Sequence, residues 1–170
     1  MNRRDDTRIV LALLCAAIMS SQVYAGDSWP QLQGSALRSG NASDEVLPAA
    51  IGLLGTVPLT DGIYTSPVVS DGTVYVVDGA GVVFAINAST LKVDWKFATE
   101  GGAGNCNNVA SPAIVERYLH VGTTAGFYYV LDRNSGEVVT RIDCKEPVFS
   151  APAVGNGRVY FATLGARVFA

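Results

Sequence analysis

The segment SPVV at residues 66–69 returns as SPAI at 111–114 and as APAV at 151–154. The three prolines are 45 and 40 residues apart, and positions downstream of each proline coincide without gaps. Self-similarity at such a period is the signature of a repeat architecture. Counted from the proline, the coinciding positions are five (Gly72, Gly157), seven (Val74, Leu119, Val159), nine (Val76, Val121, Phe161), fourteen (Gly81, Gly126), seventeen (Phe84, Tyr129, Phe169) and twenty (Asn87, Asp132).

Each repeat has the pattern of short strands separated by turns. Asp71-Gly72 is a strong signal for a tight hairpin, and β-branched and aromatic residues follow it. After residue 25 no window keeps an apolar period of 3.6 residues, so we expect very little helix. The first repeat predicts strands at 67–70, 73–77, 82–87 and 92–98.

Four antiparallel strands in about 40–45 residues form one blade of a β-propeller. A β-sandwich is the alternative, because its strands recur at a similar spacing, but sandwiches do not normally carry so regular a repeat. We therefore predict an all-β fold, a partial β-propeller of about three four-stranded antiparallel blades in an open arc, because closed propellers have about 4–8 blades. The predicted parts are an irregular leader at 26–50, an outer strand at 51–59, blades at 66–98 and 111–143, and an incomplete blade at 151–170.

One turn of the first repeat and one of the second resemble the tryptophan-docking motif of the pyrroloquinoline-quinone-like (PQQ-like) β-propeller family, A-x-D-x-x-x-G-K/E-x-x-W. In the first repeat its positions are held by Ala85, Asn87, Leu91, Lys92 and Trp95. In the second they are held by Val130, Asp132, Gly136, Glu137 and Thr140. The resemblance implies structural roles. The Trp packs on the neighbouring blade and donates its N–H to a carbonyl, and the Asp or Asn orders its turn.

This resemblance implies two functions of different kinds. The chain is expected to be a non-catalytic, protein-binding scaffold similar to the BamB-type factors of outer-membrane assembly, with no cofactor. The alternative is the N-terminal part of a quinoprotein dehydrogenase, which would bind PQQ with calcium. No acid matches a catalytic motif, and Asp61, Asp71, Asp78 and Asp132 occupy turn positions. No catalytic or metal residue is therefore assigned, and a truncated chain without function of its own is a third hypothesis.

The first 25 residues have the pattern of a secretory signal peptide. Arg3, Arg4 and Arg8 precede an 11-residue apolar segment at 9–19, too short to span a bilayer, and 23–25 forms a small-residue cleavage site. A buried N-terminal helix is the alternative. We expect an exported protein, periplasmic or extracellular, with no transmembrane segment after cleavage at Ala25.

The charge of the chain limits the classes of partner, and its cysteines allow a disulfide. The chain has 12 basic and 15 acidic residues, and the basic residues do not cluster, so nucleic acid is not an expected partner. Protein partners are expected, and open blade edges give a route to self-association. Cys106 and Cys144 remain after signal cleavage and form either a disulfide or two separate buried thiols.

We expect the glycine-rich segment 101–104 to hold the five residues by which the first repeat is longer than the second. It lacks the strand-turn-helix setting of a phosphate loop. It is either a connector between blades or a functional loop.

Overall fold

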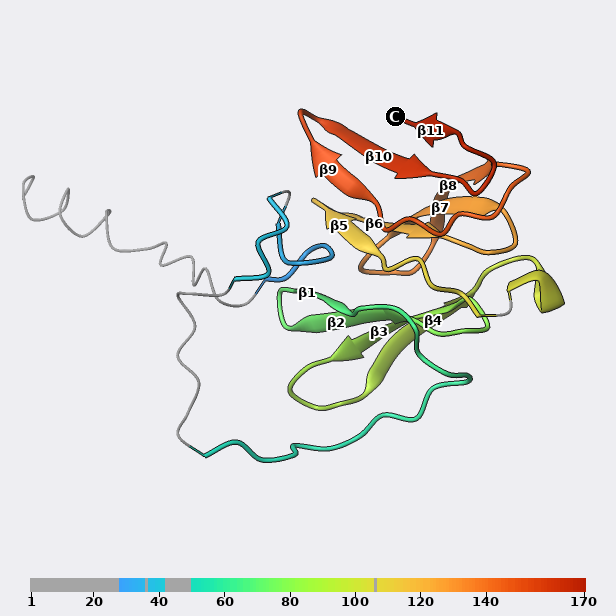
Figure 1. Ribbon diagram of the computed structural model, residues 1–170. Helices are drawn as coiled ribbons and strands as arrows, with labels where there is room; N and C mark the ends of the chain where they lie inside the picture. The colour runs from blue at the N-terminus through green and yellow to red at the C-terminus, as the bar shows by residue number, and fades with distance from the viewer. Residues whose placement is uncertain (1–27, 36, 42–49, 106) are drawn as a thin grey trace, which may run out of the picture.

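The computed structural model describes residues 28–35, 37–41, 50–105 and 107–170. These residues contain no α-helix and form three antiparallel sheets stacked along the chain, which do not close into a ring (Figure 1). This confirms the predicted all-β fold. The first sheet holds β1 (Val68–Ser70), β2 (Thr73–Val77), β3 (Val82–Asn87) and β4 (Val93–Ala98). The second holds β5 (Ala113–Val115), β6 (Tyr118–Gly122), β7 (Phe127–Asp132) and β8 (Val138–Asp143), and the third holds β9 (Ala153–Gly155), β10 (Arg158–Ala162) and β11 (Val168–Phe169).

The hairpins follow from the residues at their tips. Asp71 and Gly72 have φ of 51° and 71°, and Asn156 and Gly157 have φ of 51° and 70°. Two successive left-handed residues make the tight turn whose twist matches that of the flanking strands, and Asp, Asn and Gly tolerate it best. The turns join β1 to β2 and β9 to β10 at equivalent points of the repeat.

The core lies between the sheets, because each sheet carries apolar side chains on both faces. Four side chains of the first sheet face the second sheet. They lie eight, ten, sixteen and eighteen positions after the repeat proline and are Tyr75, Val77, Val83 and Ala85. Residues of the second sheet at seven, nine, seventeen and nineteen positions meet them; they are Leu119, Val121, Tyr129 and Leu131. Alternation along each strand therefore assigns one face to the preceding sheet and one to the following sheet.

The second and third sheets use the same rule. Tyr128 and Val130, at sixteen and eighteen positions, form a cluster with Val159, Phe161 and Phe169, at seven, nine and seventeen. The rings of Tyr128 and Phe161 are stacked with centroids 3.7 Å apart. The sequence repeat is thus a repeat of sheet-to-sheet contacts.

Trp95 on β4 ties the first sheet to the second. Its Nε1–H donates to the Arg133 carbonyl at 3.0 Å, and its ring lies against Gly136, where an added Cβ would be 2.6 Å from Cε3. Gly136 has φ of 74°, and Leu91 at the equivalent position of the first repeat has φ of 57°. The turn geometry is therefore kept where the sequence departs from Gly.

Asn87 and Asp132 order the equivalent turns after β3 and β7. Asn87 Oδ1 accepts the Ser89 and Thr90 N–H groups at 3.0 and 2.9 Å. Asp132 Oδ1 accepts those of Asn134 and Ser135 at 2.9 and 3.3 Å. The residues after these turns close them through the main chain: the Lys92 carbonyl accepts from Asn87 N–H and the Glu137 carbonyl from Asp132 N–H, each at 2.9 Å. Ala85, fully buried, lies in the core.

The leader passes the inner strand of each sheet, that is, β1, β5 and β9 (blue trace in Figure 1). Trp29 exchanges two backbone hydrogen bonds with Val69 of β1, at 2.7 and 3.0 Å, and the Pro30 carbonyl accepts from Ile114 N–H of β5 at 2.6 Å. Arg38 Nη2 donates to the Pro152 carbonyl, just before β9, at 3.2 Å. The leader therefore covers an edge that would otherwise expose unpaired backbone groups.

The outer strand expected at 51–59 is absent: the described residues there are extended but belong to no sheet. A strand needs a partner for its backbone groups, and no strand lies beside this segment (Figure 1). Instead Val57 and Leu59 pack on Val76, Phe84 and Ile86, on the outer face of the first sheet.

No helix among the described residues is long and apolar enough to cross a membrane.

We predict that Gly136→Ala destabilises the fold more than Gly72→Ala. Both substitutions put Ala at a positive φ, which costs about 1–2 kcal/mol, but only the first drives a Cβ into the Trp95 ring. The clash adds about 1–3 kcal/mol. Urea unfolding of the two variants measures the difference, and equal midpoints would contradict the described contact.

We also predict an acid-sensitive contribution from His120. It is buried with Nδ1 3.2 Å from the Tyr128 hydroxyl, and burial lowers its pKa from 6.5 to about 4. The unfolded chain therefore binds a proton that the folded chain does not, so stability falls as the pH drops from about 6.5 towards 4.

At pH 5 this loss is on the order of 2 kcal/mol relative to pH 7. Urea unfolding of the wild type and of His120→Gln at both pH values isolates it, because the other groups titrate in both proteins. The prediction fails if the two proteins lose the same stability between pH 7 and pH 5.

Candidate functional site

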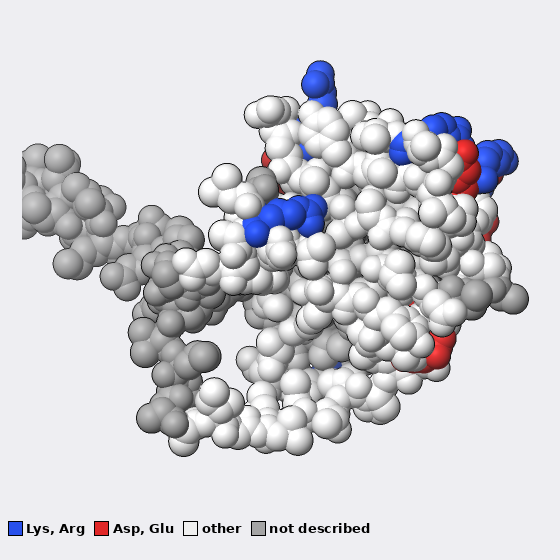
Figure 2. Space-filling model, in the orientation of Figure 1, with Lys and Arg blue, Asp and Glu red and all other residues white. Residues whose placement is uncertain are grey.

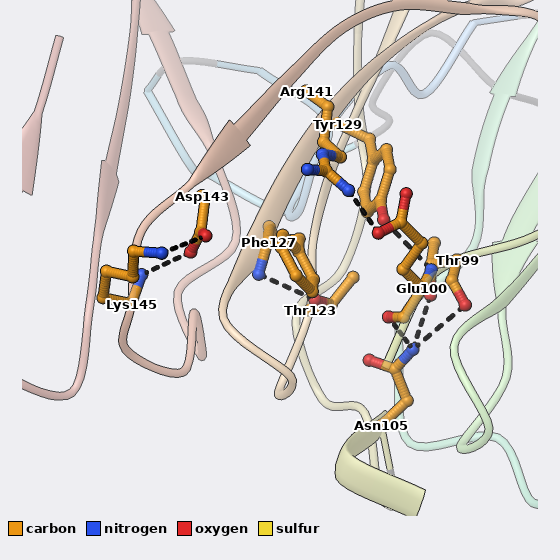
Figure 3. A network of polar contacts seen from close by, with 9 residues as sticks. All are labelled: Thr99, Glu100, Asn105, Thr123, Phe127, Tyr129, Arg141, Asp143 and Lys145. Carbon is orange, nitrogen blue, oxygen red and sulfur yellow. Dashed lines mark hydrogen bonds and ion pairs between the residues drawn. The ribbon is translucent and has the colours of Figure 1, made fainter. Parts of the chain in front are cut away.

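The loop between β4 and β5 joins two sheets through one buried amide (Figure 3). Asn105, in the 3-10 turn η1 (Gly102–Asn105), donates from Nδ2 to Thr99 Oγ1 at 2.7 Å and to the Glu100 carbonyl at 2.8 Å. Its Oδ1 accepts from the N–H of Ala125, in the turn between β6 and β7 of the second sheet, at 3.4 Å. Gly81 fits beside it only because it has no Cβ, which would lie 2.8 Å from Asn105 Cγ.

A charged pair covers this amide network. Arg141 of β8 forms an ion pair with Glu100, and its guanidinium lies 4.9 Å from the centre of the Phe127 ring. The Glu100 N–H donates to the Tyr129 hydroxyl at 3.0 Å, and burial raises the pKa of Tyr129. Figure 3 shows these side chains converging from β7, β8 and the loop after β4. Their hydrogen bonds are made with one another, so the network holds the two sheets in register.

The same contacts bear on the glycine-rich segment 101–104, for which the sequence left two alternatives: a connector between blades or a functional loop. Gly101 has φ of 126° and approaches the second sheet so closely that an added Cβ would be 2.3 Å from Ala125 Cβ. The end of the loop is fixed by Asn108, whose N–H donates to Gly79 O at 3.0 Å and whose Oδ1 accepts from Thr124 N–H at 3.0 Å. The loop is thus a packed connector between sheets.

The acids predicted to occupy turns make local contacts. Asp78 is fully buried and accepts from Val82 N–H at 2.9 Å, Thr60 N–H at 3.2 Å and Asp61 N–H at 3.1 Å. Asp61 Oδ1 accepts from the next N–H in the chain at 2.7 Å. The carboxylate of Asp78 therefore fastens the segment that leads into β1.

Two further turn acids are paired with arginine. Asp71 bonds Arg133 at 2.6 Å, and Asp132 forms an ion pair with Arg117. These hydrogen bonds lower the pKa of each carboxyl. Arg133 also donates to Ser70 Oγ at 2.6 Å, so its side chain joins the second sheet to the first turn of the first sheet.

Cys144 is a buried cysteine beside Tyr128 and Phe161, and burial raises the pKa of its thiol. Cys106 lies outside the described residues, so the pairing of these two cysteines stays a prediction. Within the described ranges, no three His, Cys, Asp or Glu side chains come together as a metal site.

Each of the three loops that lead into β1, β5 and β9 carries an exposed apolar residue. It lies three positions before the repeat proline: Tyr64, Val109 and Phe149, with 58%, 40% and 44% of the residue exposed. The strands that follow these residues are neighbours, since β1 contacts β5 and β5 contacts β9. We name these three side chains the entry-loop row. They place apolar surface on the same end of all three sheets.

Phe149 has an anchored residue on both sides, and Tyr64 has one on its C-terminal side. Next to Phe149, Val148 is buried and donates its N–H to Thr123 O at 2.9 Å, and Ser150 Oγ donates to Ala162 O at 3.1 Å. Next to Tyr64, Thr65 Oγ1 donates to Val77 O at 2.7 Å. Exposed apolar side chains on a rigid support are suited to bind another protein, because little conformational entropy is lost.

The row was not predicted from the sequence, because the equivalent positions were identified only downstream of each proline. A large apolar residue three positions before each proline was the available signal. On the face shown in Figure 2, basic and acidic side chains lie mainly near the margin, and uncharged residues make up most of the remaining surface.

Three stacked four- and three-stranded antiparallel sheets with a blade-length repeat define a β-propeller repeat protein. The family model described as outer membrane protein assembly factor BamB matches residues 53–126 and 108–170. The chain belongs to this PQQ-type propeller family, which confirms the resemblance inferred from the turn motif.

Curated relatives are of two kinds. The chain is 26% identical over 121 residues to the outer membrane protein assembly factor BamB of Legionella pneumophila, covering 66% of this chain and 30% of the relative. It is 26% identical over 186 residues to the quinohemoprotein alcohol dehydrogenase ADH-IIG of Pseudomonas putida, covering 95% of this chain and 26% of the relative. The chain thus spans less than a third of the length of each.

Solved structures share the fold. BamB from Moraxella catarrhalis superposes with a TM-score of 0.58 at 21% identity, over 66% of this chain and 38% of that one. Quinohemoprotein alcohol dehydrogenase ADHIIG from Pseudomonas putida HK5 gives a TM-score of 0.65 at 21% identity, over 83% of this chain and 23% of that one.

We predict that Asn105→Ala loosens the contact between the first two sheets. It leaves the Thr99 hydroxyl, the Glu100 carbonyl and the Ala125 N–H without their buried partner, which costs about 1–3 kcal/mol. Asn134→Ala, at an exposed position, is the matched control and should stay within about 0.5 kcal/mol of wild type. Thermal unfolding followed by circular dichroism measures both, and a neutral Asn105→Ala would show that the amide is dispensable.

Proposed function

We propose that this chain is an exported propeller segment that acts as a non-catalytic, protein-binding scaffold without a cofactor. The entry-loop row is the observation that carries this proposal: Tyr64, Val109 and Phe149 are exposed, apolar, equivalent and held by anchored neighbours. Aromatic side chains are enriched in the buried centre of protein interfaces, and charged groups are depleted there.

The chemistry of the row defines the kind of partner. A tyrosine, a valine and a phenylalanine on three adjacent loops offer apolar area with a single hydroxyl, so the partner is a protein segment that presents apolar side chains. One relative is named as an outer membrane protein assembly factor, and this supports a protein-binding role and export. The proposed signal peptide at 1–25 lies outside the described residues.

Site-specific photo-crosslinking in the producing cell tests the scaffold role. A photoreactive residue at 149 or 109 is expected to give a discrete protein adduct. The matched control is position 139 of β8, where Val139 is 51% exposed but lies outside the row. Phe149→Asp should abolish the adduct formed at 109, and Val139→Asp should not.

Equal cross-linking at 109, 139 and 149, or adducts insensitive to Phe149→Asp, would contradict the proposal. Fractionation of the same cells tests export: the protein is expected outside the cytoplasm and shortened by 25 residues, with its N-terminus at Gly26. Recovery of the uncut chain in the cytoplasm would contradict export.

The second candidate is the N-terminal part of a PQQ-dependent quinoprotein dehydrogenase. The specific observation in its favour is that two alcohol dehydrogenases align with 95% and 97% of this chain, more than BamB does. Turnover of a primary alcohol by the purified protein with added PQQ and calcium, unaffected by Phe149→Asp, would favour this candidate and overturn the non-catalytic proposal.

A further inference from the structure

The hairpins of the first and third repeats share a backbone but differ in how their tip side chains are held. The tip at 71–72 joins β1 to β2 and the tip at 156–157 joins β9 to β10, and their first residues both have φ of 51°. The carboxylate of Asp71 accepts from Arg133 Nη2 at 2.6 Å. The side chain of Asn156 is exposed and makes no hydrogen bond with a described residue. The third repeat therefore carries an unanchored carboxamide where the first carries an anchored carboxylate.

The main-chain nitrogen after Asn156 is also unbonded. It belongs to Gly157, which is exposed and whose N–H makes no main-chain hydrogen bond with a described residue. Glycine has no side chain to shield its nitrogen, and an added Cβ would meet nothing within 4 Å. The nitrogen of the next residue is the nearest main-chain nucleophile to an asparagine carboxamide, and such an intramolecular attack is favoured by proximity. Both reacting groups at this tip are thus unbonded and open to solvent.

The same nitrogen is engaged at the other asparagines that are not buried and whose successors the structure describes. These are Asn87, Asn107 and Asn134. In each case the N–H of the next residue donates a hydrogen bond. The acceptors are, in the same order, the Gly72 carbonyl at 2.9 Å, the Gly79 carbonyl at 3.0 Å and Asp132 Oδ1 at 3.3 Å. Attack at these three positions requires a hydrogen bond to be broken first, and attack at Asn156 does not.

We propose that Asn156 is a site of spontaneous covalent modification, a deamidation in which solvent water is the only co-reactant. The Gly157 nitrogen loses its proton and bonds to Asn156 Cγ, and the carboxamide nitrogen takes up a proton and leaves as ammonia. The product is a five-membered succinimide ring. Water then adds to one of the two ring carbonyls. Opening of the bond from Cγ to the ring nitrogen gives aspartate, and opening of the bond from the main-chain carbonyl carbon gives isoaspartate.

The two products have different effects on the hairpin. The aspartate form has the same tip as the first repeat, Asp71-Gly72, so the turn is kept and the chain gains one negative charge. The isoaspartate form adds a methylene to the main chain inside a two-residue tip, and the length of the tip sets the register of the strands on either side. The modification thus acts on the pairing of β9 with β10, whatever the protein binds.

Incubation of the folded protein at mildly alkaline pH, followed by peptide mapping with mass spectrometry, tests the proposal. We expect conversion at Asn156 to be at least about tenfold faster than at Asn87, Asn107 or Asn134, which corresponds to a barrier lower by about 1.4 kcal/mol. Fragmentation that cleaves beside the modified residue distinguishes aspartate from isoaspartate. Asn156→Gln is the matched control: it keeps the amide but moves the reacting carbon one bond away, so the acidic species seen by ion exchange should disappear.

A second variant tests the role of the unanchored side chain. Asp71→Asn places the same dipeptide on the matching hairpin, where Arg133 and Ser70 lie within hydrogen-bond distance of the side chain. We expect this site to convert at least about tenfold more slowly than Asn156 in the same molecule. An unmodified Asn156, equal rates at Asn156 and the three other asparagines, equal rates at 71 and 156 in the variant, or an acidic species that persists in Asn156→Gln would overturn the proposal.

Discussion

Each sheet of this chain is apolar on both faces, and this constraint governs the rest of the structure. A sheet with one polar face needs only one neighbour, whereas a sheet of this kind needs two. The second sheet has both: Leu119 and Val121 face the first sheet, and Tyr128 and Val130 face the third. Burial of each such side chain contributes about 1.5–3 kcal/mol, so stacking rather than any single sheet stabilises the fold. The turn motif at Trp95 and the buried amide of Asn105 both hold the first sheet against the second.

The repeat, the strands and the hairpin at Asp71-Gly72 were predictable because they depend on local chemistry: side-chain alternation, β-branched residues and left-handed turn positions. The family followed from the turn that holds Trp95. The strand predicted at 51–59 was wrong for a non-local reason, since its apolar residues are typical of a strand but its backbone has no partner. The role of Asn105 was also beyond prediction, because its contacts come from residues of two sheets.

The candidate site combines a rigid base with an exposed surface. The hydrogen bonds of Asn105, Glu100 and Arg141 are used between sheets, so these polar groups position the loops. The side chains left exposed at the loop entries are apolar. The polar network thus fixes the geometry of the loops, and the apolar side chains remain free to contact another molecule. Chemistry on a propeller instead depends on residues placed by individual loops, and a shared fold does not specify it.

The leader has a consequence for the order of folding. It leaves the ribosome before every strand it bonds, yet its contact from Arg38 to Pro152 spans 114 positions of the chain. Contacts of such sequence separation form late, because the chain between them must first be ordered. The leader can therefore bond Val69 of β1 long before it can reach the third sheet, and its Arg38 end stays unattached until residue 152 has been made. In the folded protein the same segment bonds Val69, Ile114 and Pro152, so one short stretch of chain ties all three sheets to the N-terminal side of the molecule.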